Sequence, residues 1–271
     1  MGCTSACSLA FPSDDYTSGS AAGGSGAGQG TGNGGSGGCQ GSACAGELQG
    51  DALVARYFIN EAASGTEPLA LDGAPGPDLY LYYQEEMRFG ESDDNRGLFW
   101  PTSLSDGYAS GEIGGTAVAN ALSAAQQATI ELVVAVNEGT GTLLAISDGL
   151  DMTLVSPTIE VSWPFQGGAW KDFPDDGTRR VVHLRVDTAA QTPVELRVNG
   201  LPLEEDYFSA IVPNAALQLA TSGSTLWLGN LEESNSSIGG AILYFAIYGS
   251  ALTPAQVTNN VTRLLASDDG S

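Results

Sequence analysis

The stretch Val181-Val-His-Leu-Arg-Val-Asp187 decides the fold class of this chain. Apolar and polar residues alternate along it, which is the period of a half-buried β-strand with one face on a core. The inward set is Val182, Leu184 and Val186, and the outward set is His183, Arg185 and Asp187. The segment 129–136 repeats this period, with Glu131 on its outward face. Both segments are therefore predicted strands of a layered β-fold.

Eight further segments have the composition and period of short strands. They are Leu53–Ile59, Leu79–Tyr83, Thr142–Ser147, Thr158–Trp163, Val194–Val198, Leu217–Thr221, Thr225–Leu228 and Ala241–Ile247. Gly, Asp, Asn and Pro, which favour turns, lie in nearly every gap between them. Short strands without helices between them predict an all-β fold, a two-sheet antiparallel sandwich or jelly roll.

One helix is predicted near the C-terminus, at Thr253–Leu265. Thr253 is a suitable N-cap, Pro254 suits the first helical position, and Gln256 completes a capping box. The apolar residues at helical spacing are Val257, Val261, Leu264 and Leu265. They form one stripe, which we expect to pack onto the sandwich.

The composition of the 271 residues changes near residue 46. Residues 1–46 hold all four cysteines and 14 of the 37 glycines but no basic residue, so we expect a disordered, glycine-rich tether there. Residues 47–271 hold 30 acidic and nine basic residues among regularly spaced apolar ones, which is enough for one core. The predicted domains are the tether at 1–46 and one jelly-roll domain at 47–271.

Charge and hydropathy exclude two classes of partner. The net charge is −23 with a single lysine, which repels nucleic-acid phosphates and anionic lipid head groups. The longest apolar runs, such as Ala241–Tyr248, are shorter than the ~20 residues that span a bilayer. We therefore expect no nucleic-acid partner, and membrane attachment only through a lipid anchor.

The first residues resemble the end of a bacterial lipobox, in which a cysteine is lipidated after cleavage. Cys3 and Cys7 are the two candidates, although neither has the usual leucine three residues before it. Lipidation at Cys7 would remove Cys3 and leave Cys39 and Cys44 as an even pair, which predicts a disulfide in an oxidising compartment. The alternative is that these are free thiols in the tail.

The order of motifs in the predicted domain resembles bacterial laminin G-like, concanavalin A-like jelly-roll domains. The closing segment Gly240–Val257 is similar to their last strand and the helix start that follows it. The other similar segments, in chain order, are Leu53–Glu61, Val182–Asp187, Val194–Gly200 and Trp227–Gly229. The resemblance implies a two-sheet jelly roll, a fold used mostly in binding modules and sometimes in enzymes that cleave glycans.

No complete catalytic pattern is found. Laminarinase-type enzymes on this fold carry two glutamates and an aspartate along one strand, but Glu91-Ser-Asp93 and Glu204-Glu-Asp206 both lack the second glutamate. His183 is the only histidine and belongs to a strand, which favours a structural role and excludes an ordinary zinc site. We therefore expect no enzyme. The alternative is a glycan-active hydrolase or lyase with an unrecognised carboxylate pair.

No cofactor is predicted, and Ca²⁺ is the ion that the sequence leaves open. The resemblance implies a calcium ligand at an aspartate of the closing strand, but that position is Leu243, which has no oxygen to donate. Oxygen-rich loops that suit Ca²⁺ in chemistry, though not in spacing, hold Asp93, Asp94 and Asn95 and also Asp172, Asp175 and Asp176. Solvated turns are the other interpretation of both loops.

A ligand site is predicted where aromatic rings, amides and carboxylates gather around a flexible loop. The residues are Trp163, Gln166, Trp170, Asp172 and Phe173. Sugar sites combine an exposed aromatic face with polar groups that bond hydroxyls. The alternative is that both tryptophans fold back onto the sheet, while Trp227 is expected in the core.

These inferences predict an extracytoplasmic, non-catalytic binding module, either lipid-anchored to the cell envelope or secreted. Its expected partner is a carbohydrate or a surface protein. A structural surface protein that self-assembles and has no soluble ligand is a further possibility.

Overall fold

The computed structural model of the protein describes residues 48–59, 70–71, 76–82, 88–92, 95–231 and 237–266. Some predictions fall outside these ranges: those at Cys3, Cys7, Cys39, Cys44, Asp93 and Asp94. Lipidation, the disulfide and the domain boundary at residue 46 therefore stay predictions. Asn95 is described only through its backbone, which pairs with Ser92.

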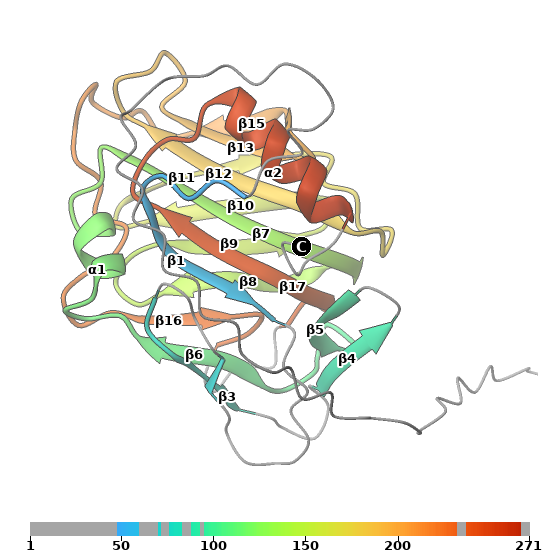
Figure 1. Ribbon diagram of the computed structural model, residues 1–271. Helices are drawn as coiled ribbons and strands as arrows, with labels where there is room; N and C mark the ends of the chain where they lie inside the picture. Colours follow the sequence, from blue (N-terminus) through green and yellow to red (C-terminus); the bar gives the residue numbers. More distant parts are fainter. Residues whose placement is uncertain are drawn as a thin grey trace, which may run out of the picture. The chain divides into compact units, whose positions relative to one another are not determined.

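Two antiparallel sheets face each other, and Figure 1 shows them as two layers. In sheet A the strand order is β14 (Leu201–Pro202), β13 (Val194–Val198), β12 (Arg180–Asp187), β7 (Gln127–Glu138), β17 (Gly239–Tyr248), β5 (Asn95–Trp100) and β4 (Arg88–Ser92). Strand β1 (Leu53–Phe58) also pairs with β17. Strands β7 and β12 pair in register from Gln127↔Asp187 to Val134↔Arg180.

Sheet B has a longer path. Its order is β15 (Glu205–Phe208), β11 (Gln166–Trp170), β10 (Thr158–Trp163), β9 (Asp151–Val155), β8 (Thr140–Ile146), β16 (Thr225–Leu228), β6 (Tyr108–Glu112), β3 (Leu79–Tyr82) and β2 (Ala70–Leu71). All strand pairs described in the two sheets are antiparallel, which confirms the predicted all-β sandwich.

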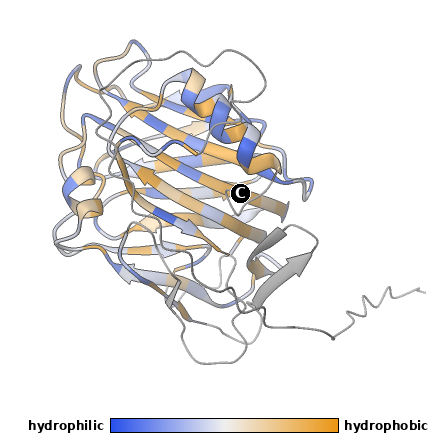
Figure 2. Ribbon diagram, in the orientation of Figure 1, coloured by the Kyte–Doolittle hydropathy of each residue, from blue (hydrophilic) through white to orange (hydrophobic). Residues whose placement is uncertain are grey.

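The main core lies between the sheets and is built from their inward rows. Val182, Leu184 and Val186 of β12 belong to it, as the alternation predicted. Figure 2 shows hydrophobic and hydrophilic residues alternating along the long strands. Burying one such side chain stabilises the fold by roughly 1.5–3 kcal/mol, so the shared rows define the inward face of each strand.

Helix α2 (Pro254–Ala266) covers the outer face of sheet A, where it lies across β12. The capping box is confirmed: the Thr253 backbone N–H donates to Gln256 Oε1 at 2.8 Å. Val257, Val261 and Leu264 are buried against a second apolar cluster on this face. The predicted stripe is wrong at Leu265, whose side chain is 41% exposed.

Several elements differ from the sequence prediction. Strands β2, β4, β5, β6, β9, β11, β14 and β15 were not predicted, and β11 lies where a flexible loop was expected. The predicted strand Leu217–Thr221 is a loop whose described pairing is a single bridge between Ala125 and Leu217. Its leucines are buried, but the Leu219 N–H donates to Leu122 O instead of to a ladder, so apolar spacing here reflects a packed loop. A short helix α1 (Ala117–Leu122), which the sequence analysis did not predict, ends at this loop.

The outer face of sheet B has no described helix over it. Its outward side chains include exposed Tyr80, Glu160, Ser162 and Tyr207. Among the described residues, α2 covers part of the outer face of sheet A, whereas exposed side chains on β3, β10 and β15 leave parts of the outer face of sheet B accessible to a ligand.

Candidate functional site

Most of the predicted ligand residues lie inside the molecule or at its edge. Trp163, Trp170 and Phe173 are 5%, 2% and 1% exposed and belong to the core. Both indoles therefore fold onto the sheet, which is the alternative interpretation given above, and offer no exposed ring to a sugar. Gln166 is partly exposed and accepts a hydrogen bond from Trp163 Nε1 at 2.8 Å. Asp172 is exposed in the loop after β11.

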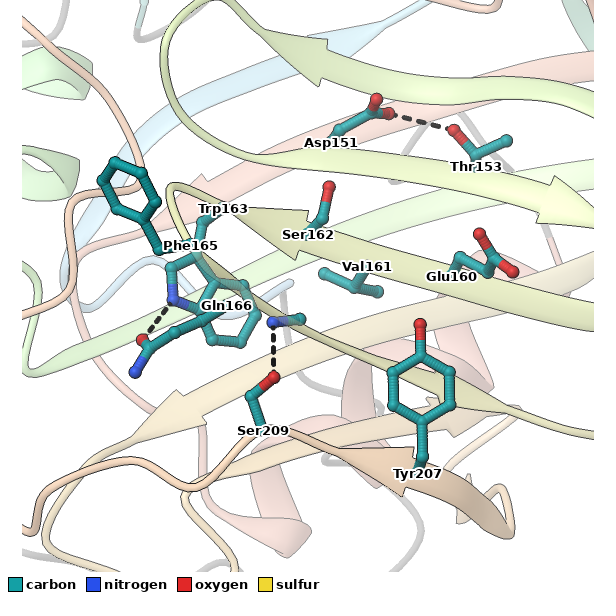
Figure 3. Close-up of a pocket in the computed structure, with 11 residues that line it drawn as sticks. Asp151, Thr153, Glu160, Val161, Ser162, Trp163, Phe165, Gln166, Tyr207 and Ser209 are labelled. Carbon is teal, nitrogen blue, oxygen red and sulfur yellow. Dashed lines mark hydrogen bonds between the residues drawn. The ribbon is translucent and has the colours of Figure 1, made fainter.

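A hollow of about 500 Å³ opens beside this loop, on the outer face of sheet B. We call it the hairpin hollow, because the turn between β10 and β11 forms one end of it. Figure 3 shows Asp151 and Thr153 on β9, Ser162 and Glu160 on β10, and Tyr207 on β15 around it. Its walls therefore combine these polar side chains with the apolar ones of Val161, Trp163 and Phe165.

The turn of the hairpin places one aromatic side chain fully in solvent. Phe165 is 105% exposed and has a φ of 66°. A left-handed backbone is unusual for a bulky residue, and the tight connection between Trp163 and its pairing partner Gln166 imposes it here. The result is an apolar ring at the edge of the hairpin hollow.

Asp151 is the partly buried carboxylate of the hairpin hollow. Burial raises the pKa of Asp151, and a hydrogen bond from Thr153 Oγ1 at 3.0 Å opposes this rise. Asp151 pairs across the strands with Ser162, and Thr153 pairs with Glu160. Glu160 is thus the diagonal neighbour of Asp151, at a backbone spacing of about 7–8 Å.

A second hollow, of about 550 Å³, lies on the same face over β3, β6 and β16. We call it the aromatic hollow, since it is lined by Tyr80, Tyr82, Tyr108 and Trp227. Tyr80 and Tyr82 are 48% and 37% exposed, and the rings of Tyr82 and Tyr108 stack at 4.8 Å between centroids. The carboxylates of Asp78 and Glu112 also line it.

This hollow was not predicted from the sequence, and Trp227 was expected in the core. In the structure Leu226 and Leu228 point inward, so Trp227 takes the outward position and is only partly buried. The alternation in Thr225–Leu228 and in Leu79–Tyr82 could have shown this, because both strands place aromatic residues between inward leucines.

The described candidates for calcium are engaged in local contacts. Asp175 accepts a hydrogen bond from Ser156 Oγ, and Asp176 forms an ion pair with Arg180 at 2.9 Å. The backbone N–H of Thr178 is the main cause that lowers the pKa of Asp176. Leu243 is buried in the apolar cluster under α2. Within the described ranges no three Asp, Glu, His or Cys side chains are grouped as metal ligands.

His183 is sealed away from both hollows. Its side chain and that of Glu131 are 0% exposed, and His183 Nε2 lies 2.7 Å from Glu131 Oε2. Both project from the outer face of sheet A, beneath α2. This pair stabilises the helix on the sheet and has no access to a substrate.

Comparison with known proteins identifies the fold but no family. No protein-family model and no curated protein matches this chain. The sialidase of Trypanosoma rangeli, solved with the inhibitor DANA, matches with a TM-score of 0.52 and 13% identity over 77% of this chain and 32% of that chain.

Two botulinum neurotoxin structures are also similar. The binding domain of neurotoxin DC, solved in complex with SialylT, matches with a TM-score of 0.52 and 10% identity over 79% of this chain and 52% of that chain. A structure of neurotoxin type C, whose cell entry depends on interaction with two ganglioside molecules, matches with a TM-score of 0.55 and 8% identity, covering 79% and 51% of the two chains.

This chain spans about a third of the sialidase and about half of the toxin chains. The likeness concerns the fold, a β-sandwich that also occurs in carbohydrate-binding proteins. Among the residues that the structure describes, no helix is both long and apolar enough to cross a membrane.

Proposed function

We propose that this protein is a non-catalytic carbohydrate-binding module of the laminin G-like kind, and that it binds glycan on the outer face of sheet B. The observation that carries the proposal is the aromatic hollow, where Tyr80, Tyr82 and Trp227 offer ring surface beside the carboxylates of Asp78 and Glu112. A surface protein as ligand remains the alternative partner.

The chemistry of a sugar fits these groups. The apolar face of a pyranose packs on an aromatic ring, and its hydroxyl groups donate to carboxylates and exchange hydrogen bonds with serine and tyrosine hydroxyls. The sialidase and neurotoxin structures support the proposal, because proteins with this fold were solved with sugar-like ligands.

We further propose that the module works outside the cytoplasm, on a glycine-rich tether anchored by lipid at Cys7 or Cys3. The tether composition supports this, since a glycine-rich coil of some 40 residues would have an r.m.s. reach on the order of 35 Å, enough to hold a domain clear of a membrane. Mass spectrometry of the protein from its native envelope tests the anchor by the mass of the N-terminal peptide.

Glycan-array binding of the full chain tests the main proposal. We expect retention of a glycan on the wild type and about tenfold weaker binding by Tyr80→Ala, the loss of roughly 1.4 kcal/mol of ring contact. Leu201→Ala is the control, because Leu201 is also an exposed large apolar residue, at 73% against 48% for Tyr80, but belongs to sheet A. Absence of any bound glycan, or full binding by Tyr80→Ala, would contradict the proposed site.

One observation favours the hydrolase alternative. Asp151 has a raised pKa, as a general acid needs, and Glu160 lies diagonally opposite on the next strand. The measurement is the release of reducing ends from a polysaccharide panel, compared between the wild type and Asp151→Asn. Turnover that Asp151→Asn abolishes would establish the enzyme in place of the binding module.

A further inference from the structure

One row of paired residues crosses sheet B and connects the two hollows. From β3 to β10 its members are Tyr80, Ser110, Trp227, Ala145, Asp151 and Ser162, each paired with the next. Laterally paired residues of an antiparallel sheet project to the same face. We call this line the cross-strand row. It runs along the outer face of sheet B, where Ser110 and Ala145 in its middle are only 8% and 6% exposed.

Ala145 is the one member of the row that lines neither hollow. Trp227 lines the aromatic hollow on one side of it, and Asp151 lines the hairpin hollow on the other. Neighbouring strands are about 4.8 Å apart, so these two flanking residues are separated by about 10 Å at the backbone. A single methyl group, and no larger side chain of the row, stands between the hollows.

The charge of the two hollows has one sign. The described side chains that line them include Asp78 and Glu112 in one and Asp151 and Glu160 in the other, but no lysine or arginine. The chain as a whole carries a net charge of −23. An anionic sugar would meet repulsion in a site without a compensating cation, whereas neutral hydroxyl groups can donate to the carboxylates.

We propose that the two hollows are subsites of one binding site, and that its ligand is a linear, uncharged oligosaccharide laid across the strands over Ala145. This inference rests on the proposed carbohydrate-binding function and specifies the shape and charge of the ligand. A chain that reaches both hollows gains affinity, because its second contact is intramolecular once the first has formed.

Titration calorimetry with oligosaccharides of graded length tests the connection. The probes are neutral gluco-, xylo- and manno-oligosaccharides from disaccharide to octasaccharide, with oligogalacturonates of the same lengths as the anionic counterpart. Within the neutral series that binds, we expect the affinity for the octasaccharide to be at least about tenfold higher than the affinity for the disaccharide. One octasaccharide should saturate each chain, and oligogalacturonates should bind at least about tenfold more weakly.

A variant between the hollows tests the path of the ligand. Ala145→Leu places a branched side chain between the two hollows. This variant should therefore bind the octasaccharide no more tightly than the disaccharide. Ala189→Leu is the control, because it makes the same change at an exposed position of the turn between β12 and β13 in sheet A. Melting curves establish that both variants fold.

A second pair of variants does not depend on the stability of Ala145→Leu. Tyr80 and Ser162 lie at opposite ends of the cross-strand row. Tyr80→Ala and Ser162→Ala should each weaken binding of the octasaccharide. If the two hollows were separate sites, each variant would instead abolish binding of disaccharide at one hollow and leave the other hollow unaffected.

Several results would overturn the inference while leaving carbohydrate binding in place. These are equal affinity for disaccharide and octasaccharide, an unchanged length dependence in a folded Ala145→Leu, or tight binding of oligogalacturonates. Binding by none of the oligosaccharides would instead contradict the proposed function itself, and the inference with it.

Discussion

Replacing Glu131 by glutamine should strongly destabilise the protein, because this buried carboxylate organises the contact between sheet A and α2. Oε1 accepts hydrogen bonds from the hydroxyls of Tyr244 and Tyr248 at 3.1 and 3.0 Å. Oε2 accepts from Nε2 of His183 at 2.7 Å and from Nδ2 of Asn260 at 2.8 Å. Four donors thus converge on two oxygens, and the carboxylate fills its whole acceptor capacity.

The guanidinium of Arg56 balances the charge of the Glu131 carboxylate without contacting it. Arg56 Nε donates to the Tyr244 hydroxyl at 3.0 Å, and Arg56 Nη2 donates to the Tyr248 hydroxyl at 3.2 Å. The two phenols therefore connect the guanidinium to Glu131. Such a network is stable only while each member has its partner.

Glutamine keeps the shape of the side chain but replaces one acceptor oxygen by an NH₂ donor. The two donors that faced this oxygen lose their acceptor, and each unsatisfied buried donor costs roughly 1–3 kcal/mol, so we expect a loss of about 2–6 kcal/mol. For a domain of this size each kcal/mol lowers Tm by roughly 2–4 °C. Urea denaturation followed by tryptophan fluorescence measures the free energy of unfolding.

Glu195→Gln is the matched control for this prediction. Glu195 lies on β13 of the same sheet, but its side chain is 21% exposed and pairs with Arg197 at 2.8 Å, so its replacement should cost less than about 1 kcal/mol. If Glu131→Gln unfolds with a free energy within about 1 kcal/mol of the wild type, the argument that the network holds α2 on sheet A is refuted.

The same residue predicts a pH dependence. Burial raises the pKa of Glu131, but hydrogen bonds from His183 and Asn260 outweigh it, and the net pKa is below the ordinary value. A depressed pKa in the folded state adds stability above the unfolded pKa of about 4.3, and this stability is lost as the pH falls through the folded value. The stability difference between wild type and Glu131→Gln should therefore be full at neutral pH and shrink below about pH 4.

Three further predictions concern the rest of the chain. Deleting residues 1–46 should leave Tm almost unchanged, whereas deleting residues 1–50 should lower it. Residues 48–50 contribute to the fold, because Leu48 is buried and the Gln49 N–H donates to Asn260 Oδ1 at 2.9 Å. Thermal melts of both truncations decide this. Trp170→Ala should cost about 3–5 kcal/mol in urea denaturation, since the indole is core, and an unchanged midpoint would place the ring outside it. Added Ca²⁺ or a chelator should not shift Tm in calorimetry, because Asp175 and Asp176 already hold Ser156 and Arg180, and a clear shift would reveal a calcium site.

The sequence by itself determined nine of the described strands and the closing helix, whereas eight further strands, such as β6 and β11, were not predicted. Alternation identified the inward rows of β7 and β12, because a strand turns successive side chains to opposite faces whatever surrounds it. The capping box located the start of α2 through contacts among residues that are close in sequence, so no tertiary information was needed. These are local properties of the chain.

Only the tertiary structure decided which outward faces are covered. Glu131 and Trp227 both occupy outward positions of their strands, yet Glu131 is sealed under a helix that comes more than a hundred residues later and Trp227 faces an open sheet. Alternation shows which residues share a face but not what packs on that face. The cross-strand row likewise depends on the register of six strands, and it unites Tyr80 with Ser162 because sheet pairing connects segments far apart in the chain.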